Sequence, residues 1–269
     1  MLVSEARKIV SDCLSLAQRE FDLLGEEGKK VVSVNQFGDT SLLVDVQIER
    51  VIIEYFRKTA APVRIYSEEH GVVEVGKNPQ NLVVLDGMDG TNRYLVDEPC
   101  GTMIGIFEGI EPYYDDYLAS GIVIQKNAFP LTAFCGEGAY WYSAKFSSGS
   151  RSGTIKFFTD LHRETNRLLA DKLIKAGMKM EDPRAMALYV SGFVQGYANV
   201  ILICTRKQNL EIAAACGLIT EAGGVIRTLD GRNLLDEKYL KFGQGQEEIP
   251  IVVAQDEELM DQILEIFNS

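Results

Sequence analysis

The feature that most constrains this chain is a short apolar run that ends in two aspartates. Leu82–Leu85 has the pattern of a buried strand, and Asp86 and Asp89 follow it across Gly87. Two carboxylates at one strand end repel each other at neutral pH unless a cation lies between them. Hard oxygen ligands of this kind suit Mg²⁺. If the two carboxylates converge on one point, the fold must bring a neutralising charge or a metal ion to this strand end.

The residues after the second aspartate add the features of an anion site. Gly90 and Thr91 offer free backbone N–H groups, and a helix that begins there would attract phosphate. A metal beside such a site suits metal-assisted phosphate chemistry. The alternative is an ordinary surface turn, because Asp and Gly are common turn residues. On this stretch alone both interpretations are open.

Three other motifs do not fit the stretch. The chain has no Gly-Lys-Ser/Thr ending of a Walker loop. An EF-hand needs Asp or Asn at its third position and Glu at its twelfth, where this chain has Met88 and Asp97. The haloacid-dehalogenase phosphatases use the first Asp of Asp-x-Asp-Gly-Thr as nucleophile, and Gly87 stands at that position here. An Asp nucleophile is therefore disfavoured.

Composition excludes several classes of partner. The chain has 269 residues, 46% of them apolar, and a net charge of −12. That charge argues against nucleic acid and anionic membrane surfaces. The negative net charge still permits an anionic substrate, because a bound metal makes the local charge at its site positive. The chain lacks the roughly 18-residue apolar run of a membrane helix, and the charged residues near Met1 do not suggest a signal peptide.

The cysteines point to a reducing compartment. The chain has 5 cysteines without a CxxC pair, and only 2 histidines, so we expect no zinc site. An odd number of scattered cysteines is typical of free thiols. We therefore expect a cytoplasmic protein.

Hydrophobic periodicity predicts alternating helices and strands. Helices are expected at 2–24, 41–58, 161–176, 184–191, 210–222 and 256–267, with Ser41 capping the second and Gly192 ending the fourth. Strands are expected at 31–34, 63–66, 82–85, 102–107, 117–124, 131–134, 139–142, 154–158, 199–204, 225–227 and 249–253. The Ser- and Gly-rich stretch 143–153 is a boundary candidate, so we expect two domains, 1–150 and 151–269. The predicted class is layered α/β.

Further acidic residues lie where burial is expected. Asp45 falls within the apolar face of the helix at 41–58, where a carboxylate is costly unless it is paired. It is either a structural Asp bonded to nearby backbone or an acid close to the metal. Glu68 and Glu69 follow the strand at 63–66. They form either a solvated loop or, since two strand ends carry acids, part of one crevice at the sheet edge.

Two bases precede the Ala-rich helix expected at 210–222. Arg206 and Lys207 are either exposed loop residues or a clamp for a second phosphate or a sugar acid. Both interpretations are open from the sequence.

Four ordered blocks resemble the inositol monophosphatase family, which has fructose-1,6-bisphosphatase among its relatives. They are Gly38-Asp39-x-Ser41-x-x-x-Asp45-x-x-Ile48-Glu49, Ser67-Glu68-Glu69, Asp86-Gly87-Met88-Asp89-Gly90-Thr91-Asn92, and Glu211-x-Ala213-Ala214-Ala215 running on to Glu221-Ala222-Gly223-Gly224. Together they cover the chain from about 35 to 226. Each block is short, but their order and spacing match throughout.

The resemblance implies a fold and an activity. The fold would be an α-β-α-β-α sandwich of the sugar-phosphatase type, commonly a homodimer. The activity would be a lithium-sensitive, Mg²⁺-dependent phosphomonoesterase that hydrolyses a small polyol, sugar or nucleotide phosphate by metal-activated water, with two or three Mg²⁺ ions per site. The alternative is a catalytically weakened member that binds a phosphorylated ligand as a sensor or partner.

The resemblance also implies roles for individual residues. Glu68 and Thr91 would orient and deprotonate the attacking water, and Asp45 would accept a hydrogen bond from Thr91. The implied metal ligands are Glu68, Asp86, the carbonyl of Met88, Asp89 and Glu211. The implied substrate-binding residues are Gly90, Thr91, Asn92 and Arg206.

The chain departs from the family pattern at three places. Gly87 replaces a Pro, Leu210-Glu211 replaces Trp-Asp, and Met180-Glu181 stands where a Gly-Ser pair is expected. Glu211 is one methylene longer than Asp and can still reach a metal. The hydrolytic half of the pattern is therefore kept, while the half that shapes the leaving-group pocket has changed.

Overall fold

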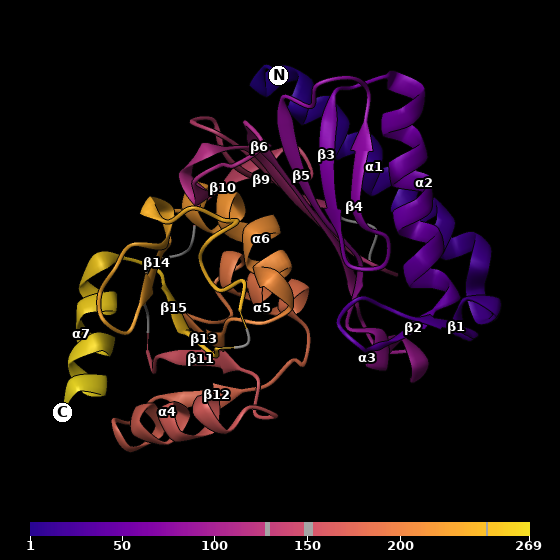
Figure 1. Cartoon of the computed structure of the whole chain (residues 1–269). Helices are drawn as coiled ribbons and strands as arrows, with labels where there is room; N and C mark the ends of the chain where they lie inside the picture. Colours follow the sequence, from indigo (N-terminus) through magenta and orange to yellow (C-terminus); the bar gives the residue numbers. More distant parts are fainter. Residues whose placement is uncertain (127–129, 148–152, 246) are drawn as a thin grey trace.

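A computed structural model describes residues 1–126, 130–147, 153–245 and 247–269, which form five alternating layers of helices and sheets (Figure 1). Helices α1 (Val3–Leu24) and α2 (Leu43–Thr59) cover the outer face of a large sheet. Helices α5 (Met186–Val194) and α6 (Leu210–Glu221) lie between this sheet and a smaller one. Helices α4 (Glu164–Lys175) and α7 (Glu257–Asn268) cover the smaller sheet. The expected α-β-α-β-α sandwich is confirmed.

The large sheet places the two acidic strand ends side by side. Within the described residues its order is β10-β9-β8-β7-β6-β5-β3-β4. The strands are β3 (Val63–Ser67), β4 (Gly71–Val75), β5 (Asn81–Asp89), β6 (Gly101–Glu108), β7 (Tyr117–Ile124), β8 (Pro130–Phe134), β9 (Gly138–Trp141) and β10 (Ala144–Phe146). Strands β3 and β5 are parallel, with Ser67 paired to Leu85, so both end at the same edge. Glu68 and Asp86, the next residues, therefore meet there.

The smaller sheet contains the strand after which the chain returns to the acidic strand ends of the large sheet. Its order within the described residues is β12-β11-β13-β15-β14. The strands are β11 (Lys156–Thr159), β12 (Lys179–Glu181), β13 (Val200–Cys204), β14 (Val225–Thr228) and β15 (Pro250–Ala254). Strand β13 leads directly into Arg206, Lys207 and helix α6.

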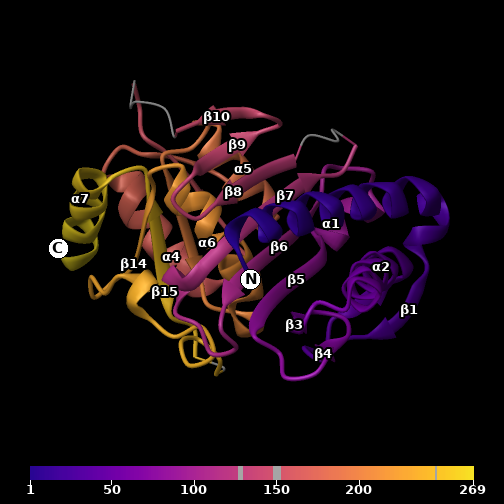
Figure 2. The same ribbon diagram turned by 90° about the horizontal axis from the view of Figure 1, so that it is seen from above.

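Apolar side chains fill the space between the layers. In the described part of the chain, one cluster lies under α1 and α2, one surrounds α5 and α6, and one lies under α4 and α7. Figure 2 shows α1 lying across the large sheet, where it contacts β6, β7 and β8. None of the helices described here is long and apolar enough to span a membrane.

Helix α6 approaches the large sheet unusually closely. Every residue from Leu210 to Ile219 is buried. A Cβ atom added to Gly105 on β6 would lie 3.0 Å from the Cα of Ala214 and 3.1 Å from the carbonyl oxygen of Ala213. Real Cβ atoms rarely come so close, so the small residues on both sides permit this approach. Glu211, in the first turn of α6, is thereby held against the sheet.

The start of the second helix differs from the prediction, which placed its N-cap at Ser41. Strands β1 (Val31–Val34) and β2 (Thr40–Leu42) form a two-stranded sheet, and Ser41 lies in β2. Helix α2 begins at Leu43, and the carboxylate of Asp45 accepts the Leu42 N–H at 2.7 Å. Ser41 as the cap is therefore wrong, because the N-cap residue is Leu42 and the Ser41 hydroxyl donates instead to the carboxylate of Glu69.

The predicted end of the fourth helix is also wrong. Gly192 lies inside α5, which continues to Val194. A Cβ atom at Gly192 would overlap the ring of Phe158 on β11, so packing rather than helix termination explains this glycine. Of the boundary candidate 143–153, residues 144–146 form β10, and 148–152 lie outside the described residues.

Candidate active site

Three carboxylates from distant parts of the chain meet at the end of β5. Glu68 follows β3, Asp86 lies in β5, and Glu211 lies in α6. Each offers one oxygen atom, and these atoms all lie within 4.8 Å of one another. All three side chains are buried. The acidic strand ends therefore do converge, and the alternatives of a surface turn and a solvated Glu-Glu loop are wrong.

The other predicted ligands lie beside this cluster. Asp89 is buried, and its carboxylate accepts the backbone N–H of Ala187 at the start of α5. The Met88 carbonyl accepts a hydrogen bond from the Thr91 hydroxyl at 3.1 Å. Asp86 Oδ1 accepts the Met88 N–H at 3.0 Å. These contacts fix the turn that connects β5 to the next helix.

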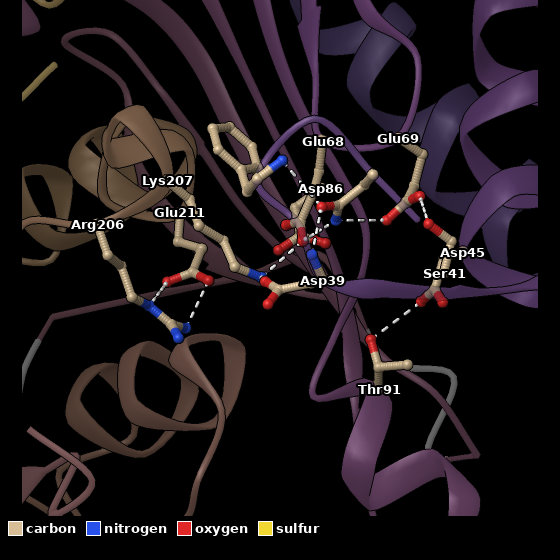
Figure 3. A network of polar contacts seen from close by, with 12 residues as sticks. Asp39, Ser41, Asp45, Glu68, Glu69, Asp86, Thr91, Arg206, Lys207 and Glu211 are labelled. Carbon is tan, nitrogen blue, oxygen red and sulfur yellow. Dashed lines mark hydrogen bonds and ion pairs between the residues drawn. The ribbon is translucent and has the colours of Figure 1, made fainter. Parts of the chain in front are cut away.

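Thr91 links this turn to Asp45. Thr91 Oγ1 lies 3.1 Å from Asp45 Oδ1 (Figure 3), and Asp45 also accepts the Leu42 N–H. Both interpretations of Asp45 therefore hold, because it is bonded to nearby backbone and it also lies close to the site. Burial raises the pKa of Asp45 to about 8. Its raised proton affinity makes it a better proton acceptor near neutral pH.

The predicted anion-binding amides lie at the start of a short helix. Helix α3 (Thr91–Leu95) begins immediately after Gly90, which has a left-handed φ of 90°. A glycine adopts this conformation readily. The N–H groups of a helix's first turn have no partners within the helix. The backbone N–H groups of Thr91 and Asn92, in the first turn of α3, are therefore available to an anion.

Glu49, to which the sequence assigned no role, ties the two acidic strand ends together. Its buried carboxylate accepts the backbone N–H groups of Glu68, Glu69 and Gly87 at 3.1, 2.9 and 3.2 Å. It also accepts the Ser67 hydroxyl and contacts His70 Nδ1 at 3.2 Å. The one available signal is its spacing, because it lies four residues after Asp45 on the same helix face.

The same contact explains why Gly87 is not proline. The Gly87 N–H donates to Glu49, and proline has no such group. A Cβ atom at Gly87 would also lie 2.7 Å from the Cγ of Glu49 and 2.8 Å from the Asp45 carbonyl oxygen. Gly87, which replaces the proline of the family pattern, therefore fits the close contact between β5 and helix α2.

Arg206 and Lys207 contact the carboxylate cluster directly. Arg206 pairs with Glu211, and Lys207 pairs with Glu68 (Figure 3). Both are half-buried. The interpretation as exposed loop bases is therefore wrong. The sequence left Arg206 and Lys207 open as a clamp for a second phosphate or a sugar acid, but it did not reveal that Lys207 would pair with Glu68, since a loop residue has no periodicity that indicates its partner.

The electrostatics of the cluster fit a divalent cation. Burial, followed by the effects of Lys207 and of neighbouring carboxylates, leaves the pKa of Glu68 raised to about 7. Burial and the charge of Glu211 raise the pKa of Asp89 to about 7. Burial and the charges of Glu68 and Asp89 raise the pKa of Asp86. Converging hard oxygen atoms with excess negative charge are a suitable donor set for Mg²⁺.

A cavity of about 430 Å³ opens beside the cluster. Glu211, Arg206 and Asn92 of α3 form part of its wall. The other lining residues include Arg93, His162, Arg163, Arg184 and Tyr189. Two predicted substrate residues, Asn92 and Arg206, thus line a space large enough for a small metabolite.

Comparison with known sequences identifies the family. A sequence profile described as the inositol monophosphatase family matches residues 2–268. The chain belongs to this family. It is 24% identical over 204 residues to an inositol-1-monophosphatase of Aeropyrum pernix, covering 73% of this chain and 75% of the relative. It is 24% identical over 219 residues to a fructose-1,6-bisphosphatase/inositol-1-monophosphatase of Methanothermobacter thermautotrophicus, covering 75% of each.

Solved structures show the same fold. A Pyrococcus horikoshii protein described as having similarities to inositol-1 monophosphatase superposes with a TM-score of 0.75 over 98% of each chain, at 21% identity. The extragenic suppressor protein SuhB of Bartonella henselae gives a TM-score of 0.79 over 97% of this chain and 98% of its own, at 17% identity. The non-catalytic alternative is not favoured by membership of the inositol monophosphatase family.

For this member of the inositol monophosphatase family we predict that Mg²⁺ stabilises the fold more at high pH. Because Glu68, Asp86 and Asp89 have raised pKa values, the folded state binds more protons than the unfolded state between about pH 4 and about pH 7. The stability of the metal-free protein therefore falls as pH rises through that range. Thermal unfolding with EDTA or excess Mg²⁺ measures the effect.

The expected result is a larger Mg²⁺-induced increase in Tm at about pH 8 than at about pH 5. Comparing the increase at each pH cancels titrations outside the cluster. An equal increase at both pH values would contradict the prediction.

Proposed function

We propose that this phosphatase hydrolyses a small polyol, sugar or nucleotide phosphate with the help of Mg²⁺ and an activated water. The observation that carries the proposal is the meeting of Glu68, Asp86 and Glu211 within 4.8 Å, next to the Thr91–Asp45 pair. Glu68, Asp86, the Met88 carbonyl, Asp89 and Glu211 are the proposed ligands. When bound, a divalent ion supplies the positive charge that stabilises the entering and leaving oxygens of an in-line displacement.

The protein's own groups supply the proton acceptor. The Thr91 hydroxyl has one proton but two acceptors within 3.1 Å, Asp45 and the Met88 carbonyl. Its oxygen can therefore accept a hydrogen bond from water while its own proton goes to Asp45. Burial gives Asp45 the proton affinity that this role needs. We propose that Glu68 and Thr91 orient the water and that Asp45 receives the proton through Thr91.

The cavity favours an ester that carries a second negative charge. We propose that Gly90, Thr91, Asn92 and Arg206 face the transferred phosphate. Arg93 and Arg163 already pair with Glu98 and Glu248. The guanidinium of Arg184, by contrast, forms no ion pair with any residue that the structure describes. A bisphosphate or a sugar acid phosphate could place its distal group there, because Arg suits planar and tetrahedral oxyanions.

A phosphate-release screen tests the function. The panel includes inositol monophosphate, fructose 1,6-bisphosphate, NADP and nucleoside monophosphates, each with Mg²⁺, with EDTA, and with Mg²⁺ plus Li⁺. We expect release that needs Mg²⁺, is inhibited by Li⁺, and is fastest with a substrate carrying a second anionic group. The Arg184→Met variant should raise the KM for that substrate about tenfold and leave a monophosphate nearly unaffected.

The screen also separates the two candidate functions. Calorimetry on the same panel detects binding independently of turnover. Mg²⁺-dependent binding without phosphate release from any member would favour a sensor or partner that binds a phosphorylated ligand. Release from at least one member supports the phosphatase.

We further propose a homodimer in the reducing cytoplasm, with domains 1–150 and 151–269 that together complete the site. All five cysteines, each within the described part of the chain, are free, which supports a reducing compartment. The entry of Glu211 from the second half supports a site shared between the halves. Light scattering after size-exclusion chromatography measures the oligomeric state.

A further inference from the structure

Arg184, which lines the cavity beside the carboxylate cluster, has a backbone conformation that is unusual for its residue type. Its φ angle is 61°, in the left-handed region that residues other than glycine, asparagine and aspartate rarely adopt. A proline followed by a residue of positive φ is the pattern of a type II turn, and glycine usually stands where Arg184 follows Pro183. Strained residues of this kind persist only where surrounding contacts hold them, and they cluster at ligand sites.

Two hydrogen bonds to one carboxylate oxygen hold this turn. Asp182 Oδ1 accepts the backbone N–H of Arg184 at 2.9 Å and the hydroxyl of Tyr189 at 2.6 Å. Tyr189 is buried in α5, and its ring lies against that of Phe158 on β11, with the ring centroids 5.9 Å apart. Asp182 therefore ties the strained residue to a side chain that close packing keeps in place.

The residues after Arg184 are fixed to the proposed phosphate and metal sites. The backbone N–H of Ala187 donates to the carboxylate of Asp89. Ala185 lies beside Gly90, because a Cβ atom added to Gly90 would lie 3.1 Å from the Cβ of Ala185. Contacts on both sides of Arg184 thus determine where its backbone lies relative to the turn that would bind the reacting phosphate.

The guanidinium that this turn presents to the cavity is free to bind a ligand. The three other arginines of the cavity wall, Arg93, Arg163 and Arg206, each pair with a glutamate. Arg184 has no such partner in the described part of the chain, and its side chain is exposed. Because a long exposed side chain can rotate, the fixed backbone is what limits the positions that its guanidinium can reach.

We propose that Asp182 is a specificity-determining residue, because the turn that it holds sets where Arg184 binds the distal anionic group of the substrate. This inference rests on the proposed function. Asp182 and Tyr189 act through Arg184 and are therefore positioning residues. The site selects a small ester whose second anionic group lies at a fixed separation from the reacting phosphate, such as a sugar bisphosphate. Without Asp182, Arg184 relaxes to a right-handed conformation, and its guanidinium leaves that position.

Phosphate release from fructose 1,6-bisphosphate and fructose 1-phosphate tests the inference, since these esters differ only in the distal phosphate. We expect the wild type to have a KM at least about tenfold lower for the bisphosphate. The Asp182→Ala variant should raise this KM about tenfold, with kcat and the KM for fructose 1-phosphate changed less than about twofold. The Asp182→Asn variant should resemble the wild type, because an amide oxygen accepts the same two hydrogen bonds.

A double variant separates positioning from a general structural role. The Asp182→Ala/Arg184→Met protein should have the same KM for the bisphosphate as Arg184→Met alone, because Asp182 acts only through Arg184. The Tyr189→Phe variant removes one of the two hydrogen bonds and should raise the KM about threefold. It provides the test if Asp182→Ala does not fold. The matched control is Asp171→Ala, at an exposed position on α4, which should change neither KM.

Three results would overturn the inference. They are a wild type that does not prefer the bisphosphate, an Asp182→Ala variant that affects both esters equally or neither, and additive effects in the double variant. If Asp182→Ala does not fold, an unchanged KM in Tyr189→Phe overturns it. Mg²⁺-dependent release from any member of the phosphate panel would then leave the proposed function standing. No release from any phosphate ester would refute both.

Discussion

Replacing Asp86 with Asn is expected to reduce Mg²⁺-dependent phosphate release by about a thousandfold. Asn has nearly the same shape, and its carbonyl oxygen can keep the 3.0 Å hydrogen bond from the Met88 N–H. The substitution removes the negative charge that faces the metal. A divalent ion contributes several kcal/mol to transition-state stabilisation, and about 4 kcal/mol corresponds to about a thousandfold in rate. Steady-state phosphate release with saturating Mg²⁺ measures the loss.

The same variant should be more stable than the wild type when metal is absent. Burial and neighbouring carboxylates raise the pKa of Asp86, which shows that its charge is costly in the metal-free fold. Urea unfolding with EDTA at about pH 8 should therefore shift to a higher midpoint. Asp171→Asn, at an exposed position on α4, is the matched control for both measurements. Undiminished turnover in Asp86→Asn would be inconsistent with the proposed metal site.

Replacing Gly87 with Ala is expected to destabilise the fold by about 2 kcal/mol or more, because overpacking a rigid interior costs about 1–3 kcal/mol. The new methyl group would lie 2.7 Å from the Cγ of Glu49 and 2.8 Å from the Asp45 carbonyl oxygen. Since the carbonyl belongs to a helix backbone, it cannot rotate away. Relief requires α2 to move away from β5, which stretches the hydrogen bonds that the Glu68 and Glu69 N–H groups donate to the Glu49 carboxylate.

Urea unfolding and titration with Mn²⁺, which prefers the same oxygen ligands as Mg²⁺, check this second prediction. The control is Gly245→Ala, where the nearest atom to a new Cβ lies 3.9 Å away. We expect the Gly87→Ala protein to show both a lower unfolding midpoint and weaker Mn²⁺ binding, whereas the control should change neither. Loss of stability with normal Mn²⁺ affinity would mean that the Glu49 contacts do not position the ligands.

The acidic strand ends could be recognised in the sequence because they break a strong pattern. Leu82–Leu85 is continuously apolar, as expected for a strand buried on both faces, and the carboxylates after it have no apolar role. Glu68 stands out for the same reason, since it follows a strand that alternates. The layered fold could be predicted because most helices and strands carry their own periodicity.

The contacts that organise the site produce no comparable pattern in the amino-acid sequence. Glu49 binds backbone N–H groups, which every residue except proline has, so its partners cannot be recognised by residue type. Lys207 reaches Glu68 because three successive residues, Lys207 to Asn209, have left-handed φ angles, and none of them is a glycine. Gly192 suggested the end of a helix, but the residue is small because the ring of Phe158, on strand β11, packs directly against it. These features depend on tertiary contacts rather than local propensity.

The close approach of α6 to the large sheet bears on ion selectivity. Glu211 is carried by α6, while Asp86 is carried by β5, so the gap between their carboxylates depends on how nearly the helix backbone touches β6 at Gly105. The metal–oxygen distances of Mg²⁺ and Ca²⁺ differ by about 0.3–0.5 Å. That is less than the space a single methyl group would need between Gly105 and Ala214. At the proposed metal site we therefore expect the preference between the two ions to depend partly on residues that never touch the metal.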